Sequence, residues 1–251
     1  MKNASEYGRR IRRLLRELPL RANTAASSDH ADVADELVRA ALLRYAPHDV
    51  AVPALRRLRA ATVDLNELRV TPVDELVELL GDGFPQAREA AETVCRLLTA
   101  VFNRCHKLDL GFIRSMPRRQ AQEYLQKLDG ADAFITAMVL LRPLGHHAVP
   151  IDDAMLGWLR AADLIPADAS PADAQSFFAR LVPAGRGEAF VATLRQQMKT
   201  AARQRLRITK ASSGGHASRT HRRRGAATVG KRAPRPSTGA RRRANSKGRS
   251  S

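Results

Sequence analysis

The chain has 251 residues, of which 43 are Lys or Arg and 25 are Asp or Glu, for a formal net charge of +18. It contains no uncharged apolar run of about 18 residues, which argues against a membrane-spanning helix. Its two cysteines, Cys95 and Cys105, are too few for a disulfide framework or a four-cysteine metal site. The charge is unevenly placed: residues 199–251 hold 17 of the Lys and Arg residues and no carboxylate. A near-neutral body with a cationic end indicates a polyanion partner.

Residues 1–29 are predicted to form a basic amphipathic helix over 6–18, followed by a linker. Tyr7, Ile11 and three leucines share one stripe of this helix, with arginines around it. The stripe either packs on the body or lies on DNA or an acidic membrane surface. The Arg-rich segment also fits an organelle presequence, although Glu6 and Glu17 count against it, and it lacks the apolar stretch of a secretory signal.

Residues 30–198 are predicted to form one all-α domain, because apolar residues recur at helical spacing and no alternating run is found. Thr71 is expected to cap a helix with Pro72 as its first residue, and Ser170 to cap another that begins at Pro171. Gly81 is expected to end the helix that follows Pro72. The expected helices cover 29–44, 50–60, 72–80, 85–103, 117–128, 132–144, 152–162, 170–182 and 188–205, with a short turn at 65–68.

Residues 199–251 are predicted to hold the end of the last helix and a disordered Lys/Arg-rich tail, because the segment has few large apolar residues to offset the entropy of ordering. Counterion release would make such a tail bind a nucleic-acid backbone. It has no aromatic residue after Arg207 to stack on bases, so we expect it to read charge and not sequence. RNA or ribosome binding and a plain solubility role are the alternatives. The arginine clusters in this tail are Arg222, Arg223, Arg224, Arg241, Arg242 and Arg243.

The segment Leu128-Asp129-Gly130-Ala131-Asp132 joins two predicted helices and is followed, after the second, by Val149-Pro150-Ile151-Asp152. This order resembles the helix-hairpin-helix DNA glycosylases of the endonuclease III superfamily, and the similarity extends over about residues 30–200. The resemblance implies a two-lobed all-α domain in which a damaged base is flipped into a cleft. It also implies that the hairpin grips a DNA phosphate at the start of its second helix.

The resemblance places the family's catalytic carboxylate on Asp152 and its lyase lysine on Phe134, so we expect no lyase activity. Asp152 also begins a helix, so a capping role is the simpler reading, with Asp153 as an alternative cap that would leave Asp152 to the cleft. Phe134 is expected in the core. The family's C-terminal four-cysteine iron–sulfur loop is absent, so no metal or cofactor is expected.

The hairpin departs from the family pattern, because Asp132 stands where a second glycine is expected. Two carboxylates beside an anion site weaken it, so we expect Arg118, Arg119 and Lys127 to assist Gly130 in binding DNA.

Two functions therefore remain open. The first is a monofunctional DNA glycosylase of base excision repair that hydrolyses an N-glycosidic bond with Asp152. The second is a catalytically inactive architectural or nucleoid DNA-binding protein with a histone-like tail. Both predict DNA as the partner, no membrane, and a cytoplasmic, nucleoid-associated location, or the nucleus in a eukaryote.

Overall fold

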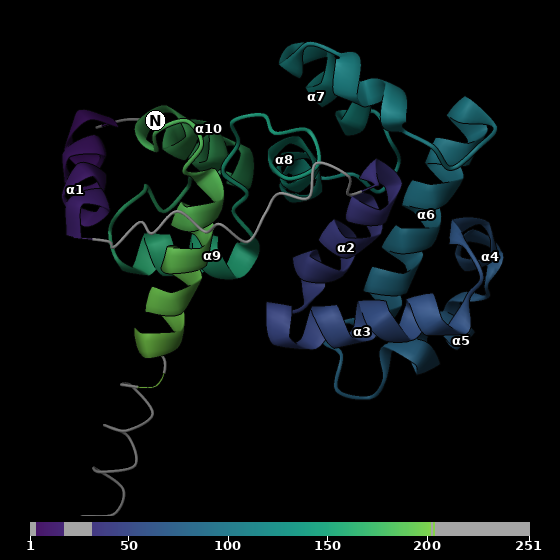
Figure 1. Cartoon of the computed structure of the whole chain (residues 1–251). Helices are drawn as coiled ribbons and strands as arrows, with labels where there is room; N and C mark the ends of the chain where they lie inside the picture. Colours follow the sequence, from purple (N-terminus) through teal and green to yellow (C-terminus); the bar gives the residue numbers. More distant parts are fainter. Residues whose placement is uncertain (1–3, 18–31, 202, 204–251) are drawn as a thin grey trace, which may run out of the picture. The chain divides into compact units, whose positions relative to one another are not determined.

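The computed structural model describes residues 4–17, 32–201 and 203. Every regular element in these residues is a helix and none is a strand, as the apolar spacing predicts (Figure 1). Apart from Arg203, these residues belong to one unit, Met1–Ala202. Within this described part, no helix has the length and apolar character needed to cross a bilayer.

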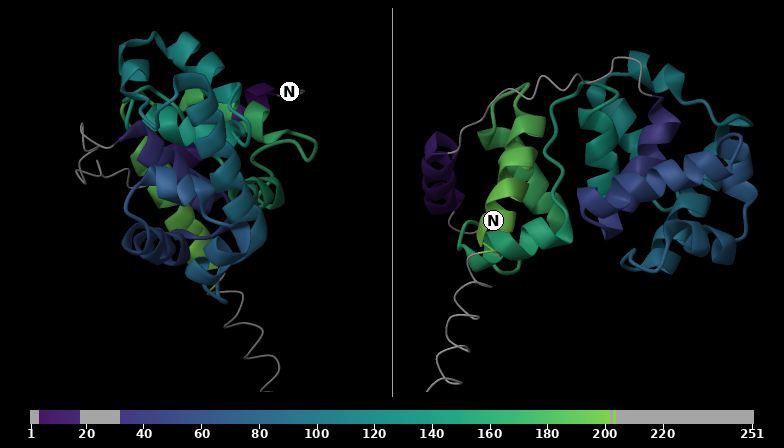
Figure 2. Two further views of the ribbon diagram at one scale, coloured as in Figure 1. Left: turned by 90° about the vertical axis from the view of Figure 1, so that its right-hand side faces the viewer. Right: turned by 60° about the horizontal axis from the view of Figure 1, so that its bottom comes forward.

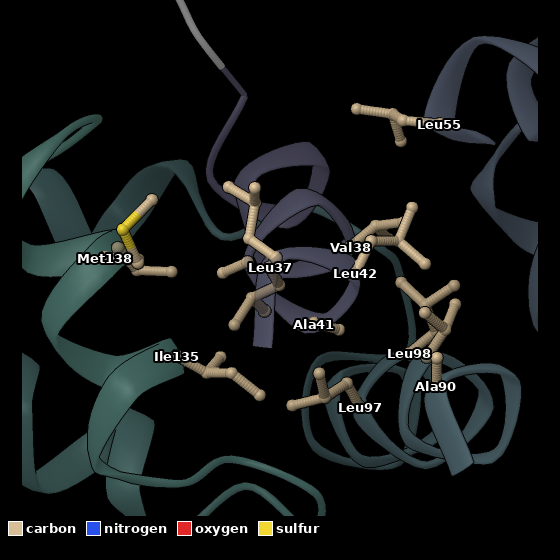
Figure 3. Close-up of a cluster of buried hydrophobic side chains, with 14 of the residues drawn as sticks. Leu37, Val38, Ala41, Leu42, Leu55, Ala90, Leu97, Leu98, Ile135 and Met138 are labelled. Atoms are coloured by element: carbon tan, nitrogen blue, oxygen red, sulfur yellow. The ribbon is translucent and has the colours of Figure 1, made fainter. Parts of the chain in front are cut away.

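The first hydrophobic core lies around α2, which is placed between α6 and α8. Leu37 of α2 lies toward Ile135 and Met138 of α8, whereas Val38 and Leu42 lie toward α6 (Figure 3). These side chains are buried, and burying one Leu or Ile stabilises a fold by about 1.5–3 kcal/mol. The elements of this core are α2 (Val33–Tyr45), α3 (His48–Ala61), α4 (Leu65–Val70), α5 (Val73–Leu80), α6 (Ala87–Cys105), the 3-10 helix η1 (Gly111–Ser115), α7 (Arg118–Gln126) and α8 (Ala133–Leu141).

A second core is built by α1 (Ala4–Glu17), α9 (Asp153–Ala161), α10 (Pro171–Leu181) and the helix over residues 187–201 (Figure 2). The Ile11 side chain of α1 is completely buried in it, and Arg10 forms an ion pair with Asp163. The apolar stripe of the N-terminal helix therefore packs on the body, which was the first of its two predicted roles.

The predicted helix caps are confirmed at α9 and α10 but not at α5, and α2 begins at Val33 and not at residue 29. Ser170 and Asp173 form a reciprocal capping box at α10, and Gly81 ends α5 with a φ of 81°. The α5 prediction is wrong by one residue, because α5 begins at Val73 and Pro72 occupies its N-cap. The Thr71 hydroxyl instead donates to the Glu67 carbonyl at the end of α4, at 2.8 Å.

Candidate functional site

A cleft of about 720 Å³ lies between elements of the two cores. The end of α2, the start of α3 and the end of α8 line it from the first core. The start of α9 and the 187–201 helix line it from the second. Tyr45 is the one Phe, Tyr or Trp residue among those that line it, and most of its polar side chains are ionisable. The charged lining residues are Arg39, Arg44, Arg142, Arg195, Lys199, Asp152, Asp153 and Glu188.

Asp152 stands at the wall of this cleft and is 14% exposed. Its Oδ1 accepts the Met155 backbone N–H at 2.7 Å and so caps α9. Its Oδ2 accepts from Arg195 Nη2 at 3.1 Å. One carboxylate thus both caps the helix and faces the cleft. The alternative in which Asp153 is the cap is wrong, because Asp153 is the first helical residue and Asp152 has the extended cap backbone.

Arg44 joins the hairpin to the start of α9. Its Nε donates to Asp132 Oδ2 at 2.5 Å, and its Nη1 lies 2.7 Å from Asp153 Oδ2. Asp132 also caps α8, because its Oδ1 accepts the Ile135 backbone N–H at 2.8 Å. Partial burial opposes the charge of the guanidinium, but the two carboxylates outweigh it and raise the pKa of Arg44.

A buried carboxylate, Glu36, forms ion pairs with Arg39 and Arg142, two arginines that line the cleft. Glu36 is 5% exposed, and its Oε1 lies 2.9 Å from Arg39 Nη1 and 3.5 Å from Arg142 Nε. Burial raises the pKa of Glu36 even though both arginines oppose the shift. Burial also disfavours the charged form of His48 and so lowers its pKa. Four nearby cations lower this pKa further, and Arg39 has the largest effect among them. Arg142 also lies 3.6 Å from Glu188 of the 187–201 helix, so this cluster links the two cores.

The hairpin between α7 and α8 has the predicted glycine turn. Gly130 has a φ of 87°, and a Cβ added there would lie 3.2 Å from Leu97 Cγ and 3.3 Å from the Thr93 carbonyl oxygen of α6. The turn is therefore pressed against α6, and glycine is needed both for its backbone conformation and for the close approach.

The predicted DNA-contact residues do not gather in one place. Lys127, at the C-terminal end of α7, and Asp129 line a second pocket of about 420 Å³ beside the hairpin turn. Arg118 and Arg119 lie at the opposite end of α7, where Arg118 borders a small cavity against α8 and α10. Arg119 is 91% exposed and pairs with Glu123. The tail arginines 222–224 and 241–243 lie outside the described residues.

Phe134, at the position that the resemblance gives to the lyase lysine, is 2% exposed and belongs to the first core, as predicted. Cys95 and Cys105 are unpaired thiols. Among the residues that the structure describes, no cluster of three or more His, Cys, Asp or Glu could hold a metal ion.

Sequence reasoning missed Arg44 and Arg195, which contact the carboxylates of the site. Each is an arginine on a helix with several others, and its partner is distant along the chain. The sequence shows only that α2 and the 187–201 helix carry basic residues. It does not show which carboxylate each of these residues contacts.

No protein-family model and no curated protein sequence matches the chain. Solved structures do match it. A trapped endonuclease III–DNA covalent intermediate aligns with a TM-score of 0.57 at 15% identity, over 74% of this chain and 83% of that one. The 8-oxoguanine glycosylase/lyase of Clostridium acetobutylicum, in complex with double-stranded DNA, aligns with a TM-score of 0.56 at 13% identity, over 80% and 71%. A thermostable thymine-DNA glycosylase gives 0.52 at 15% identity, over 77% and 87%.

These similarities show that the chain has the fold of the helix-hairpin-helix DNA glycosylases, which confirms the fold implied by the hairpin and the Asp152 loop.

Proposed function

We propose that this protein binds duplex DNA and removes a damaged base by hydrolysing its N-glycosidic bond, with Asp152 as the catalytic carboxylate. The observation that carries the proposal is the position of Asp152, at the start of α9 on the wall of a cleft large enough for a flipped base. DNA is the partner that a glycosylase fold and a basic C-terminal segment both favour.

The chemistry needs little beyond a placed carboxylate. As the C1′–N bond breaks, the base leaves with the bonding electrons and takes up a proton, and positive charge develops on the sugar. The Asp152 carboxylate stabilises that charge, or accepts a proton from the water whose oxygen bonds to C1′. Arg195, at 3.1 Å, holds Oδ2 in a fixed orientation. With Phe134 buried in the core, no amine at that position is available for strand cleavage, so the product is an intact strand with an abasic site.

A second function is a catalytically inactive architectural DNA-binding protein. Two contacts favour it: Asp132 fills the start of α8, and Arg195 already engages the Asp152 carboxylate. In either case we propose that the cationic segment 199–251 holds the protein on the DNA backbone, and that the protein is cytoplasmic and nucleoid-associated, or nuclear in a eukaryote.

Single-turnover base release separates the two functions. The full chain is incubated with duplexes carrying uracil, alkylated purine, oxidised purine or oxidised pyrimidine, and alkali then reveals abasic sites. Asp152→Asn keeps a good helix cap, so it removes the charge without removing the cap. Asp64→Asn is the matched control, because Asp64 caps α4 with the same bond, to the Glu67 backbone N–H at 2.9 Å, outside the cleft.

For a glycosylase we expect release from one lesion class, a loss of about 10²- to 10⁴-fold in Asp152→Asn, and no loss in Asp64→Asn. Equal release by Asp152→Asn and wild type would remove Asp152 from the mechanism. DNA binding without release from any lesion would establish the architectural function.

A further inference from the structure

We propose that a phosphate of duplex DNA binds in the pocket formed by Arg96, Arg104 and Lys127, beside the hairpin turn, and not at the start of α8. The inference rests on the proposed function for DNA as the partner, but it does not depend on catalysis. It assigns the phosphate contact to two arginines of α6 that the sequence pattern does not single out.

The start of α8 is already occupied by a carboxylate. Asp132 Oδ1 accepts the Ile135 backbone N–H and Oδ2 accepts from Arg44. A phosphate drawn to the same helix end would face that carboxylate, and two like charges at such short range repel each other. Arg44 offsets little of this repulsion, because Asp153 shares the same guanidinium. A phosphate contact near the hairpin therefore requires another cationic group.

The pocket beside the hairpin supplies that group. It measures about 420 Å³ and is lined by residues of α6 together with Lys127 and Asp129 of the hairpin turn. Three exposed cations and one carboxylate, Asp129, line it, so its charge is positive. The close packing of Gly130 on α6 brings the turn to Arg96, because a Cβ on Gly130 would lie 3.4 Å from Arg96 Cβ.

The two arginines are held in place before any ligand arrives. Arg104 Nη2 donates to the Lys127 carbonyl oxygen, and its guanidinium lies 5.5 Å from the centroid of the Tyr124 ring. Arg96 Nη2 donates to Thr93 Oγ1 at 3.3 Å. A guanidinium has five N–H donors, so one such bond orients the group and leaves donors for phosphate oxygens.

An aromatic pair lies next to this cationic pocket. Phe112 of η1 is exposed and meets Tyr124 edge to face, with the ring centroids 5.5 Å apart, and Arg104 covers Tyr124. An apolar ring beside guanidinium groups offers a surface for sugar or base contact together with the phosphate contact, which is typical of nucleic-acid interfaces.

The test compares salt dependence among variants of the full chain. Arg96→Gln/Lys127→Gln removes two charges of the pocket and retains the Lys127 carbonyl that holds Arg104. Arg56→Gln/Arg88→Gln is the matched control, because it removes two exposed arginine charges from α3 and α6 outside the pocket. Affinity for an undamaged duplex is measured by fluorescence anisotropy over a series of salt concentrations, and thermal melting checks that each variant is folded.

Affinity decreases with salt, so the slope of log affinity against log salt is negative. We expect its magnitude to be smaller by about 0.9 in the pocket variant than in the control, which corresponds to one lost phosphate contact. Equal slopes in the two variants would overturn the inference and leave the proposed function standing. A loss seen with duplex RNA and not with DNA would assign the pocket to RNA and overturn it too. Failure of the wild-type chain to bind DNA at all would overturn both proposals.

Discussion

Replacement of Gly130 by alanine tests whether the hairpin turn depends on its close packing against α6. The residue has a φ of 87°, which an L side chain rarely adopts, and the space for a Cβ is restricted. The nearest atoms are Leu97 Cγ at 3.2 Å and the Thr93 carbonyl oxygen at 3.3 Å. The carbonyl belongs to the middle of α6 and cannot move without disturbing that helix.

Alanine variants of two other glycines separate the contributions of backbone strain and of crowding to the expected loss in the free energy of unfolding. Gly157 lies inside α9 with open space around it, so Gly157→Ala should stabilise the fold by up to about 1 kcal/mol through helix propensity. Gly145 has a φ of 64° but no atom within 4 Å of an added Cβ. Gly145→Ala should therefore lower the free energy of unfolding through backbone strain alone. We expect a net loss of about 1 kcal/mol, because alanine also reduces the entropy of the unfolded chain and so offsets part of the strain. Gly130→Ala adds crowding worth about 1–3 kcal/mol, so we expect a total of about 2–4 kcal/mol.

Urea unfolding followed by far-ultraviolet circular dichroism measures all three variants, because the signal reports every helix. The chain has one tryptophan, Trp158, which packs against the second core and would report that part of the molecule. The expected order of stability is Gly157→Ala, wild type, Gly145→Ala, Gly130→Ala. A Gly130→Ala variant as stable as Gly145→Ala would refute the close packing of the hairpin on α6.

Two further predictions concern buried charge and the tail. Burial raises the pKa of Glu36 above its ordinary value of 4.5, so the protonated form is favoured in the folded state, and this contribution to stability is lost as pH rises through the raised pKa. Glu36→Gln should therefore gain stability relative to wild type between about pH 4 and about pH 7, by about 1.4 kcal/mol for each unit of the shift, measured by urea unfolding at both pH values. A difference that does not change with pH would contradict this reasoning. Deletion of residues 210–251 should lower DNA affinity and flatten its salt dependence, because the deleted arginines would no longer release counterions. Equal binding by the full and shortened chains at both low and high salt would exclude the tail as the main contact.

Much of the fold follows from local signals in the sequence. The start of α10 is specified by Ser170 and Asp173, which cap each other over three residues, and the end of α5 by a glycine that tolerates a positive φ. Phe134 could be placed in the core because it lies in an apolar helix. These features depend on neighbours within one or two helical turns, and such neighbours can be read from the chain directly.

The candidate site is harder to predict because its contacts join distant positions. Arg44 meets Asp132 and Asp153, and Arg195 meets Asp152. No residue spacing reveals such pairs before the helices are placed. The sequence shows that Asp132 departs from the glycine pattern, but it does not show that the carboxylate caps α8 and has an arginine partner. The 3-10 helix η1 was missed as well, since five residues carry too little periodicity to detect.

The two cores divide the chain unequally, and this has a consequence for synthesis on the ribosome. The first core uses the continuous stretch from Val33 to Ala148, so it can form as soon as that stretch has emerged. The second core combines Ile11 with residues from Val149 to Leu194. Helix α1 is therefore synthesised before the residues that it packs against. These residues follow on the order of 10 s later, at about 5–20 residues per second. We expect the arginines around its apolar stripe to keep the nascent segment soluble during that interval.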